Sequence, residues 1–447
     1  MFRPRSVRLF FLVVIELARK YTRSLVLGFV AGLLLSVLFW RAYPFFARSL
    51  TYRMDRVGMV GEYSPSNLPA SIQQLISQGL TELAPDGTPK PALSEKWEAT
   101  NSGKTFIFTL KKDVTWHNGK TVTALDVNYN IRGVTFVPTG DNMLIAHLQY
   151  PYSPFPSLLS KPVFLPGLTG IGKYSVGNIQ LAGGSVKSVS LYPKLGEKLT
   201  PKQFTFYQTE AQAQLAFQLG EIDELVEMST VSALANWGNV TVTEQTKYDR
   251  IVTLFFNMRN PELSDKTIRQ GLAYGIPELP YEKAGSPISK TSWAYAKNVK
   301  NYTYNPIEAK KMIGQTRLAT ESGQLTLSTF PSYLDTAQKI AASWTALGMP
   351  TKVQVESTVP QDYQVLLSAQ DVPPDPDQYP FWHSTQGPTN ITGYVNVKID
   401  KLLEDGRVEL DQEKRKLIYT DFQRRLVEEA PAIFLYYPKL YTVTRGK

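Results

Sequence analysis

After about residue 56 the chain shows two kinds of hydrophobic pattern. Strict alternation of apolar and polar positions is typical of a half-buried strand, and in residues 104–111 it places Phe106, Phe108 and Leu110 on one face. Apolar residues three or four positions apart are typical of a helix, as in residues 335–347. Further strands are predicted over 185–192, 202–207 and 250–257, and further helices over 210–219, 265–274, 306–313, 399–410 and 413–429. Their irregular order predicts a mixed α/β body of more than one lobe.

A different pattern precedes this body. Residues 24–40 are seventeen consecutive uncharged and mostly apolar positions, which span about 25 Å as a helix. Trp40 ends the segment where amphipathic rings favour the membrane interface, and Arg19, Lys20 and Arg23 precede it. The segment therefore predicts a single-pass anchor in the cell membrane, with a cytoplasmic N-terminus and an extracytoplasmic body. A cleaved secretory signal peptide is the alternative.

The charge follows the same division. Ten of the 48 basic residues and two of the 39 acidic residues lie within residues 1–56, so the remaining body is almost neutral. The net charge of +9 therefore belongs to the leader and does not indicate nucleic-acid binding. The sequence contains no cysteine, which excludes disulfides, thiolate metal sites, thiol nucleophiles and a lipid-modified cysteine in these residues.

The most distinctive motif of the body covers residues 91–131. Asn118 and Gly119 form a favourable hairpin turn, and Thr123 is a favourable helix N-cap. The characteristic positions of the motif are Pro91, Ala92, Leu93, Trp97, Leu110, Lys111, Trp116, His117, Asn118, Gly119, Thr123, Ala124, Asp126 and Val127.

Further motifs follow in a fixed order along the chain. They are Gly172-Lys173-Tyr174, Leu219-Gly220-Glu221-Ile222-Asp223, Phe256-Asn257 with Asp265, Arg269 and Gln270-Gly271-Leu272-Ala273, Asp375-Pro376-Asp377 with Trp382, and Arg415, Tyr419, Gln423, Glu428 and Pro431. With residues 91–131, they resemble the extracytoplasmic solute-binding proteins of peptide/nickel-type ABC importers, the oligopeptide- and dipeptide-binding family. The resemblance covers roughly residues 70–437. The stretch after Tyr274 is abridged by comparison with that family.

The resemblance implies an α/β fold of the periplasmic-binding-protein type, with two lobes and an extra small domain on lobe 1, preceded by the N-terminal transmembrane helix. The predicted parts are residues 1–56 as basic segment and anchor, 57–81, 165–252 and 418–447 as lobe 1, 82–164 as the inserted small domain, and 253–417 as lobe 2. Two strands near 253–257 and 432–436 are expected to join the lobes, which close over a ligand.

The resemblance also implies a ligand site between the lobes. In peptide-binding members an acid just before the Asp-Pro pair holds the peptide amine, because an unpaired ammonium in a closed cleft costs several kcal/mol. Asp371 is therefore the predicted partner of the amine, and Asp375 and Asp377 are alternatives that otherwise shape the turn. Further candidates for the walls of the site, each of which otherwise belongs to the core, are Trp116, Trp382, Asn390 and Tyr394.

Two proline-rich loops stand apart from the predicted strands and helices. Residues 150–156 and 371–382 each combine a rigid backbone with aromatic side chains, and the second adds three carboxylates. A loop pre-shaped by proline loses little entropy when it closes on a ligand. Each loop is therefore either a binding wall or an ordinary surface connection.

Catalytic and metal-binding chemistry has little support. His117, His147 and His383 lie on separate segments without metal-binding spacing, so no metal or cofactor is predicted. The predicted function is that of a monomeric, membrane-anchored substrate-binding protein, which passes oligopeptides or dipeptides to an ABC permease and its ATPase subunits. One alternative is a ligand-binding scaffold or sensor of the same fold. The other is an anchored cell-wall hydrolase, although no hydrolase motif is present.

Overall fold

The computed structural model divides the chain into two compact units, residues 1–55 with 199–201, and residues 56–198 with 202–447. The structure describes residues 54–231, 234–235, 237–314 and 323–446, and Glu16, Lys20, Tyr21, Thr22, Gly32, Leu33 and Ser36 before them. Within this described part of the chain, no helix is long and apolar enough to span a bilayer. Most of the predicted membrane helix, residues 24–40, lies outside the described residues.

The first sheet of the large unit has seven strands. In spatial order they are β12 (Val240–Thr246), β18 (Lys439–Arg445), β11 (Glu224–Met228), β1 (Asp55–Val60), β10 (Lys202–Tyr207), β9 (Ser185–Pro193) and β8 (Tyr174–Ala182). Helix α5 (Glu210–Gln218) packs Ala213 and Phe217 against Leu225 of β11. Helix α3 (Ala70–Ile76) contacts β8. The predicted strands over 185–192 and 202–207 and the predicted helix over 210–219 are confirmed.

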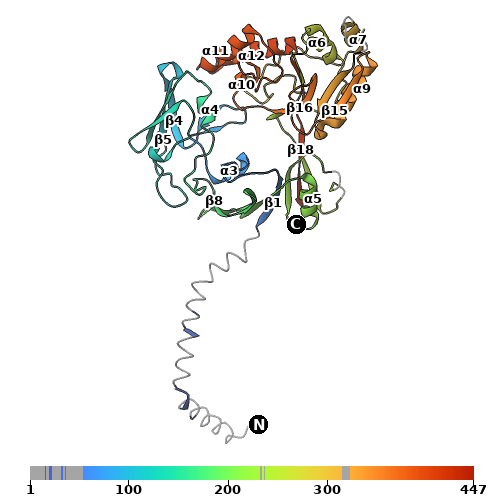
Figure 1. The fold of residues 1–447 in the computed structure, drawn as a ribbon. Coiled ribbons are helices and arrows are strands. Elements are labelled where there is room, and N and C mark those ends of the chain that lie inside the picture. The colour runs from blue at the N-terminus through green and yellow to red at the C-terminus, as the bar shows by residue number, and fades with distance from the viewer. Residues whose placement is uncertain are drawn as a thin grey trace, which may run out of the picture. The chain divides into compact units, whose positions relative to one another are not determined.

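The second sheet has five strands and a helical layer on each face (Figure 1). Its strands are, in order, β15 (Thr351–Val355), β14 (Leu325–Thr329), β16 (Val365–Asp371), β13 (Arg250–Phe256) and β17 (Ala432–Tyr436). Alternate residues of the central strand β13 enter two cores, Val252 and Leu254 on one face and Ile251 and Phe255 on the other. Burial on both faces explains its continuous apolar run.

The helices of this second sheet match the predicted helical periodicity. Helices α6 (Lys266–Tyr274), α7 (Pro306–Gly314) and α9 (Leu334–Ala346) cover one face, where the predicted stripe of Ile340, Trp344 and Leu347 is buried. Helices α10 (Tyr379–Trp382), α11 (Val397–Val408) and α12 (Gln412–Glu429) cover the other face. The predictions of helices over 265–274, 306–313, 335–347, 399–410 and 413–429 are confirmed.

A third, smaller core lies within residues 80–163. Its four-stranded sheet runs β4 (Ser94–Thr100), β5 (Thr105–Leu110), β7 (Met143–Leu148) and β6 (Val134–Thr139), beside the pair β2 (Thr81–Leu83) and β3 (Pro89–Pro91). Phe106 and Phe108 of β5 pack on Phe155 of the short helix α4 (Phe155–Leu158). The alternation predicted for residues 104–111 is therefore confirmed.

The helix that the motif predicts after Thr123 is reduced to one 3-10 turn, Ala124–Asp126. Thr123 and Asp126 still form a capping box, in which the Asp126 carboxylate accepts a hydrogen bond from Thr123 N. The backbone becomes extended at Val127, and Asn130 has a positive φ of 49°. A single capped turn cannot propagate into a helix once the next residues leave the helical region.

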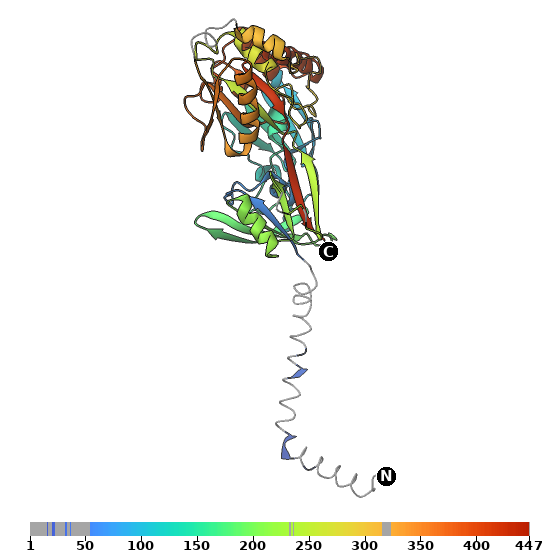
Figure 2. The same cartoon turned by 90° about the vertical axis from the view of Figure 1, so that its right-hand side faces the viewer.

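The chain passes between the two large sheets at residues 247–249 and 437–438 (Figure 2). A hydrogen bond of 2.9 Å from Lys247 N to Pro438 O joins these two connections. The predicted lobe boundaries lie at 252/253 and 417/418 instead. All of β13, α12 and β17 belong to the second sheet and its helical layer. The division into lobes and its boundaries stay a prediction.

Candidate functional site

The predicted amine partner Asp371 ends strand β16 directly opposite Arg250, the first residue of β13. Arg250 Nε donates to Asp371 Oδ1 at 2.7 Å, and the side chains remain 45 % and 77 % exposed. Burial would lower the pKa of Arg250, but the hydrogen bond and charge of Asp371 raise it. Asp371 is therefore accessible, as a ligand contact must be, but its carboxylate is already paired with the guanidinium of Arg250.

Two tyrosines are influenced by the charge of Arg250. Tyr333 lies just before α9, and Tyr63 lies on the loop after β1 of the first sheet. Burial raises the pKa of both phenols, while the nearby charge of Arg250 lowers it.

A mostly apolar cavity lies beside the same strand. Alternation along β16 puts Leu366, Ser368 and Gln370 on the cavity face, whereas Asp371 and its partner Arg250 belong to the opposite face of the sheet. The residues that line the cavity are Phe255, Val359, Leu366, Ser368, Ala369, Gln370, Phe381, Trp382, Pro388, Thr389, Ile391 and Thr392. An apolar cavity with a few polar groups has the composition of a small-ligand site.

Trp382 is the predicted site residue that lines this cavity. It is 1 % exposed, and it meets Phe434 of β17 edge to face at 5.9 Å. Its Nε1 has no hydrogen-bond partner among the residues that the structure describes. A buried indole N–H without a partner is costly, so it offers a donor to a guest in the cavity.

Asn390 and Tyr394 shape the loop that forms one side of the cavity. The Asn390 amide donates to Tyr394 O at 2.8 Å, and Thr392 Oγ1 donates to Asn390 Oδ1 at 2.9 Å. Both predicted residues are buried, at 2 % and 4 % exposure. These contacts position Ile391 and Thr392 on the cavity.

The alternatives Asp375 and Asp377 are each paired with an arginine. Arg415 holds Asp375 through two hydrogen bonds of 2.8 and 3.2 Å, with both side chains almost fully buried. Arg407 holds Asp377 through Nε at 3.1 and 3.0 Å. Unlike Asp371, both acids are inaccessible, and their contacts fit the shaping of the turn.

Trp116 lies apart from the other candidates. It is 1 % exposed in the core of the four-stranded sheet, and its Nε1 donates to Asp126 at 3.4 Å. The structure therefore brings Trp382, Asn390 and Tyr394 to the cavity region, places Asp371 at the end of β16 on its other face, and leaves Trp116 elsewhere. Arg250 and the aromatic neighbours Tyr63 and Tyr333 were missed, although a lone arginine at the start of a buried strand is a usable signal.

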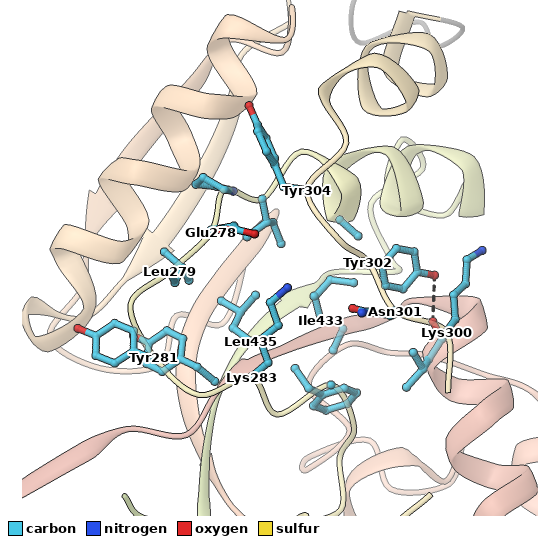
Figure 3. Close-up of a pocket in the computed structure, with 18 residues that line it drawn as sticks. Glu278, Leu279, Tyr281, Lys283, Lys300, Asn301, Tyr302, Tyr304, Ile433 and Leu435 are labelled. Carbon is cyan, nitrogen blue, oxygen red and sulfur yellow. Dashed lines mark hydrogen bonds between the residues drawn. The ribbon is translucent and has the colours of Figure 1, made fainter. Parts of the chain in front are cut away.

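A second pocket borders the edge strand β17 (Figure 3). Figure 3 shows Glu278, Lys283 and Asn301 around it, with Tyr281 and Tyr302 on opposite sides. The Tyr302 hydroxyl donates to Val427 O at 3.0 Å. Within the described part of the chain, none of the predicted ligand residues lines this pocket.

Two of the three histidines, His117 and His383, make contacts within the fold. His117 Nε2 contacts Gly172 O at 3.0 Å, and His383 stacks on Tyr379 at 4.0 Å between ring centroids. Among the residues that the structure describes, no three His, Asp or Glu side chains are grouped so as to hold a metal ion.

Comparison with known proteins identifies the family. The family model for bacterial extracellular solute-binding proteins, family 5 Middle, matches residues 88–149 and 192–391, which is more than half of the chain, and the chain belongs to this family. It is therefore an extracytoplasmic substrate-binding component of an ABC importer and not an enzyme, as predicted.

Individual relatives are similar over most of their length. The oligopeptide-binding protein AppA of Bacillus subtilis is 24 % identical, over 86 % of this chain and 86 % of AppA. The structures of the substrate-binding protein CtaP from Listeria monocytogenes and of NikZ from Campylobacter jejuni in complex with Ni(L-His) match with TM-scores of 0.76 and 0.71. They are 20 % and 21 % identical, and each covers 88 % of this chain and 94 % of its own. The predicted periplasmic-binding-protein fold is thereby confirmed.

Proposed function

We propose that the protein captures peptides at the ends of β13 and β16 in the second sheet and passes them to an ABC permease. The observation that carries the proposal is the accessible Arg250–Asp371 pair at the ends of β13 and β16. The similarity to an oligopeptide-binding protein supports the same ligand class.

The ion pair suits a zwitterionic chain end. Asp371 can accept hydrogen bonds from a peptide ammonium, while Arg250 can donate to a carboxylate or a peptide carbonyl. Because the pair is neutral as a whole, a neutral zwitterion leaves no net charge when the site closes.

Nickel is the second ligand class that a similar structure indicates, because NikZ is in complex with Ni(L-His). The described residues contain no group of metal-ligating side chains, which favours the peptide. A metal that arrives already complexed by histidine needs fewer ligands from the protein, so nickel belongs in the test.

We propose further that residues 24–40 tether the protein to the membrane. Their support is the uncharged apolar run with basic residues before it and Trp40 at its end. The tether would keep the binding unit close to its permease without a lipid-modified cysteine.

The test combines native mass spectrometry with calorimetry on the full-length chain. The chain is incubated separately with an equimolar mixture of dipeptides to pentapeptides, with Ni(L-His) and with haemin. We expect a complex with intact peptide. Binding of nickel or haemin alone would refute the peptide assignment. No complex at all would favour a scaffold, and shortened peptides would indicate a hydrolase.

Asp371→Asn is expected to weaken peptide binding about tenfold or more, because a hydrogen bond to a charged group is worth about 1.5–3 kcal/mol. Asp421→Asn is the matched control, since Asp421 forms an exposed ion pair with Arg425 on α12 at 2.9 Å. Equal affinities of the two variants in calorimetry would exclude Asp371 from the site.

A further inference from the structure

The two proline-rich loops singled out in the sequence lie in contact with each other. The Tyr152 hydroxyl donates to Asp377 Oδ2 at 3.1 Å, across 225 positions of the chain. Ser157 Oγ approaches Asp375 Oδ2 at 3.5 Å. These contacts join the part that carries the four-stranded sheet to the loop that leads from β16 into the helices of the second sheet.

Tyr152 touches both members of a largely buried ion pair. Asp377 is 7 % exposed at its side chain and is held by Arg407, whose NH2 group lies 2.9 Å from Oδ2. The guanidinium lies between two rings, 3.8 Å from the centroid of Tyr379 and 5.4 Å from that of Tyr152. Burial and the charge of Asp377 raise the pKa of Tyr152, so its hydroxyl remains a donor at physiological pH.

The next residue of the same loop caps helix α11. Ser153 N donates to Arg407 O at 2.7 Å, and Ser153 Oγ donates to Gly406 O at 3.2 Å. Carbonyls in the last turn of a helix have no partner within the helix. The loop around Tyr152 therefore satisfies the end of a helix that belongs to the other side of the contact.

The part that carries the four-stranded sheet, residues 80–163, is called the small part below. Its residues 86–88 contact the same surface. Trp293 N donates to Asp86 O at 3.0 Å, and Gln412 Nε2 donates to Thr88 Oγ1 at 3.1 Å. Between them, Gly87 lies so close to Pro374 that an added Cβ would be 2.2 Å from its carbonyl oxygen. Movement of the second sheet away from the small part must break all of these contacts together.

We propose that Tyr152 is a positioning residue, which sets how firmly the protein stays closed over its ligand by locking the small part onto the Asp377–Arg407 pair. The consequence for ligand capture rests on the proposed function. The lock itself requires no ligand, because all of its groups are supplied by the chain. Loss of one hydrogen bond to a charged group corresponds to about a tenfold change in an equilibrium.

The experiment measures the distance across the lock without ligand. Because the chain has no cysteine, spin labels attach only to the two introduced cysteines, Lys96→Cys on β4 and Lys352→Cys on β15. Both positions are exposed. Pulsed electron paramagnetic resonance on the full-length chain is expected to show one main distance. Adding Tyr152→Phe should raise a longer-distance population about tenfold, and Ser157→Ala should raise it to a smaller degree.

Tyr150→Phe is the matched control, since Tyr150 is 70 % exposed and its hydroxyl meets only Gln149 at 3.4 Å among the described contacts. A distance distribution of Tyr152→Phe equal to that of Tyr150→Phe would overturn the proposal. A lower melting temperature with an unchanged distance would show a merely structural role and would overturn it as well. Failure of peptide binding with a shifted distance would refute the proposed function and leave the lock standing.

Discussion

At the scale of single residues, three acids of one loop have three different surroundings. Asp371 is exposed and shares its charge with Arg250, whereas Asp375 and Asp377 are buried against Arg415 and Arg407. Exposure separates a group that a ligand can reach from groups that hold the loop in shape. The sequence predicts the acids but not their partners, because Arg415 lies 40 positions after Asp375 and nothing local specifies the pair.

Asp375→Asn is expected to destabilise the protein by about 3–5 kcal/mol, because it leaves the buried guanidinium of Arg415 without its counter-charge. Urea unfolding measures the change in the free energy of unfolding. Asp421→Asn, which breaks an exposed pair, should cost less than about 1 kcal/mol. Unchanged stability with weaker peptide binding would instead make Asp375 a ligand contact, as the sequence allows.

At the scale of elements, local patterns predict most of what the structure contains. The apolar alternation of residues 104–111 becomes β5, and the helical stripe of residues 335–347 becomes α9, because each pattern matches the period of its element. The shortened turn after Thr123 and the partners of β18 escape prediction. Strand β18 joins β11 and β12, more than 190 positions earlier, and such pairing depends on the whole fold.

Thr209→Ala tests a predicted helix start. Thr209 accepts a hydrogen bond from Gln212 N at 3.3 Å at the beginning of α5, and loss of such a cap costs about 1 kcal/mol. Thr420→Ala is the control, because Thr420 lies inside α12 and its hydroxyl only returns to Lys416 O. Equal free energies of unfolding for both variants would contradict the assigned cap.

At the scale of the whole molecule, buried phenols link stability to alkaline pH. Burial raises the pKa of Tyr129, Tyr302, Tyr419 and Tyr437, and it raises the pKa of Tyr436 to about 12. The unfolded chain ionises these groups near pH 10, while the folded chain keeps them protonated. Their contribution is therefore fully present below about pH 10 and is lost as the pH rises through their folded-state values.

The free energy of unfolding should accordingly stay level between pH 8 and 9 and decrease by about 1 kcal/mol per buried tyrosine between about pH 10 and 11. Urea titrations with circular dichroism at these pH values measure it. A free energy that is as large at pH 11 as at pH 8 would show that the phenols ionise freely in the folded protein.

In the proposed function, an intact peptide is held at the Arg250–Asp371 pair at the ends of β13 and β16. The most direct measurement is a crystal structure of the full-length chain grown with tetra-alanine. We expect continuous density for the uncut peptide, with its ammonium about 3 Å from a carboxylate oxygen of Asp371. A peptide in the pocket beside β17, cleaved products or an unoccupied site at saturating peptide would contradict it.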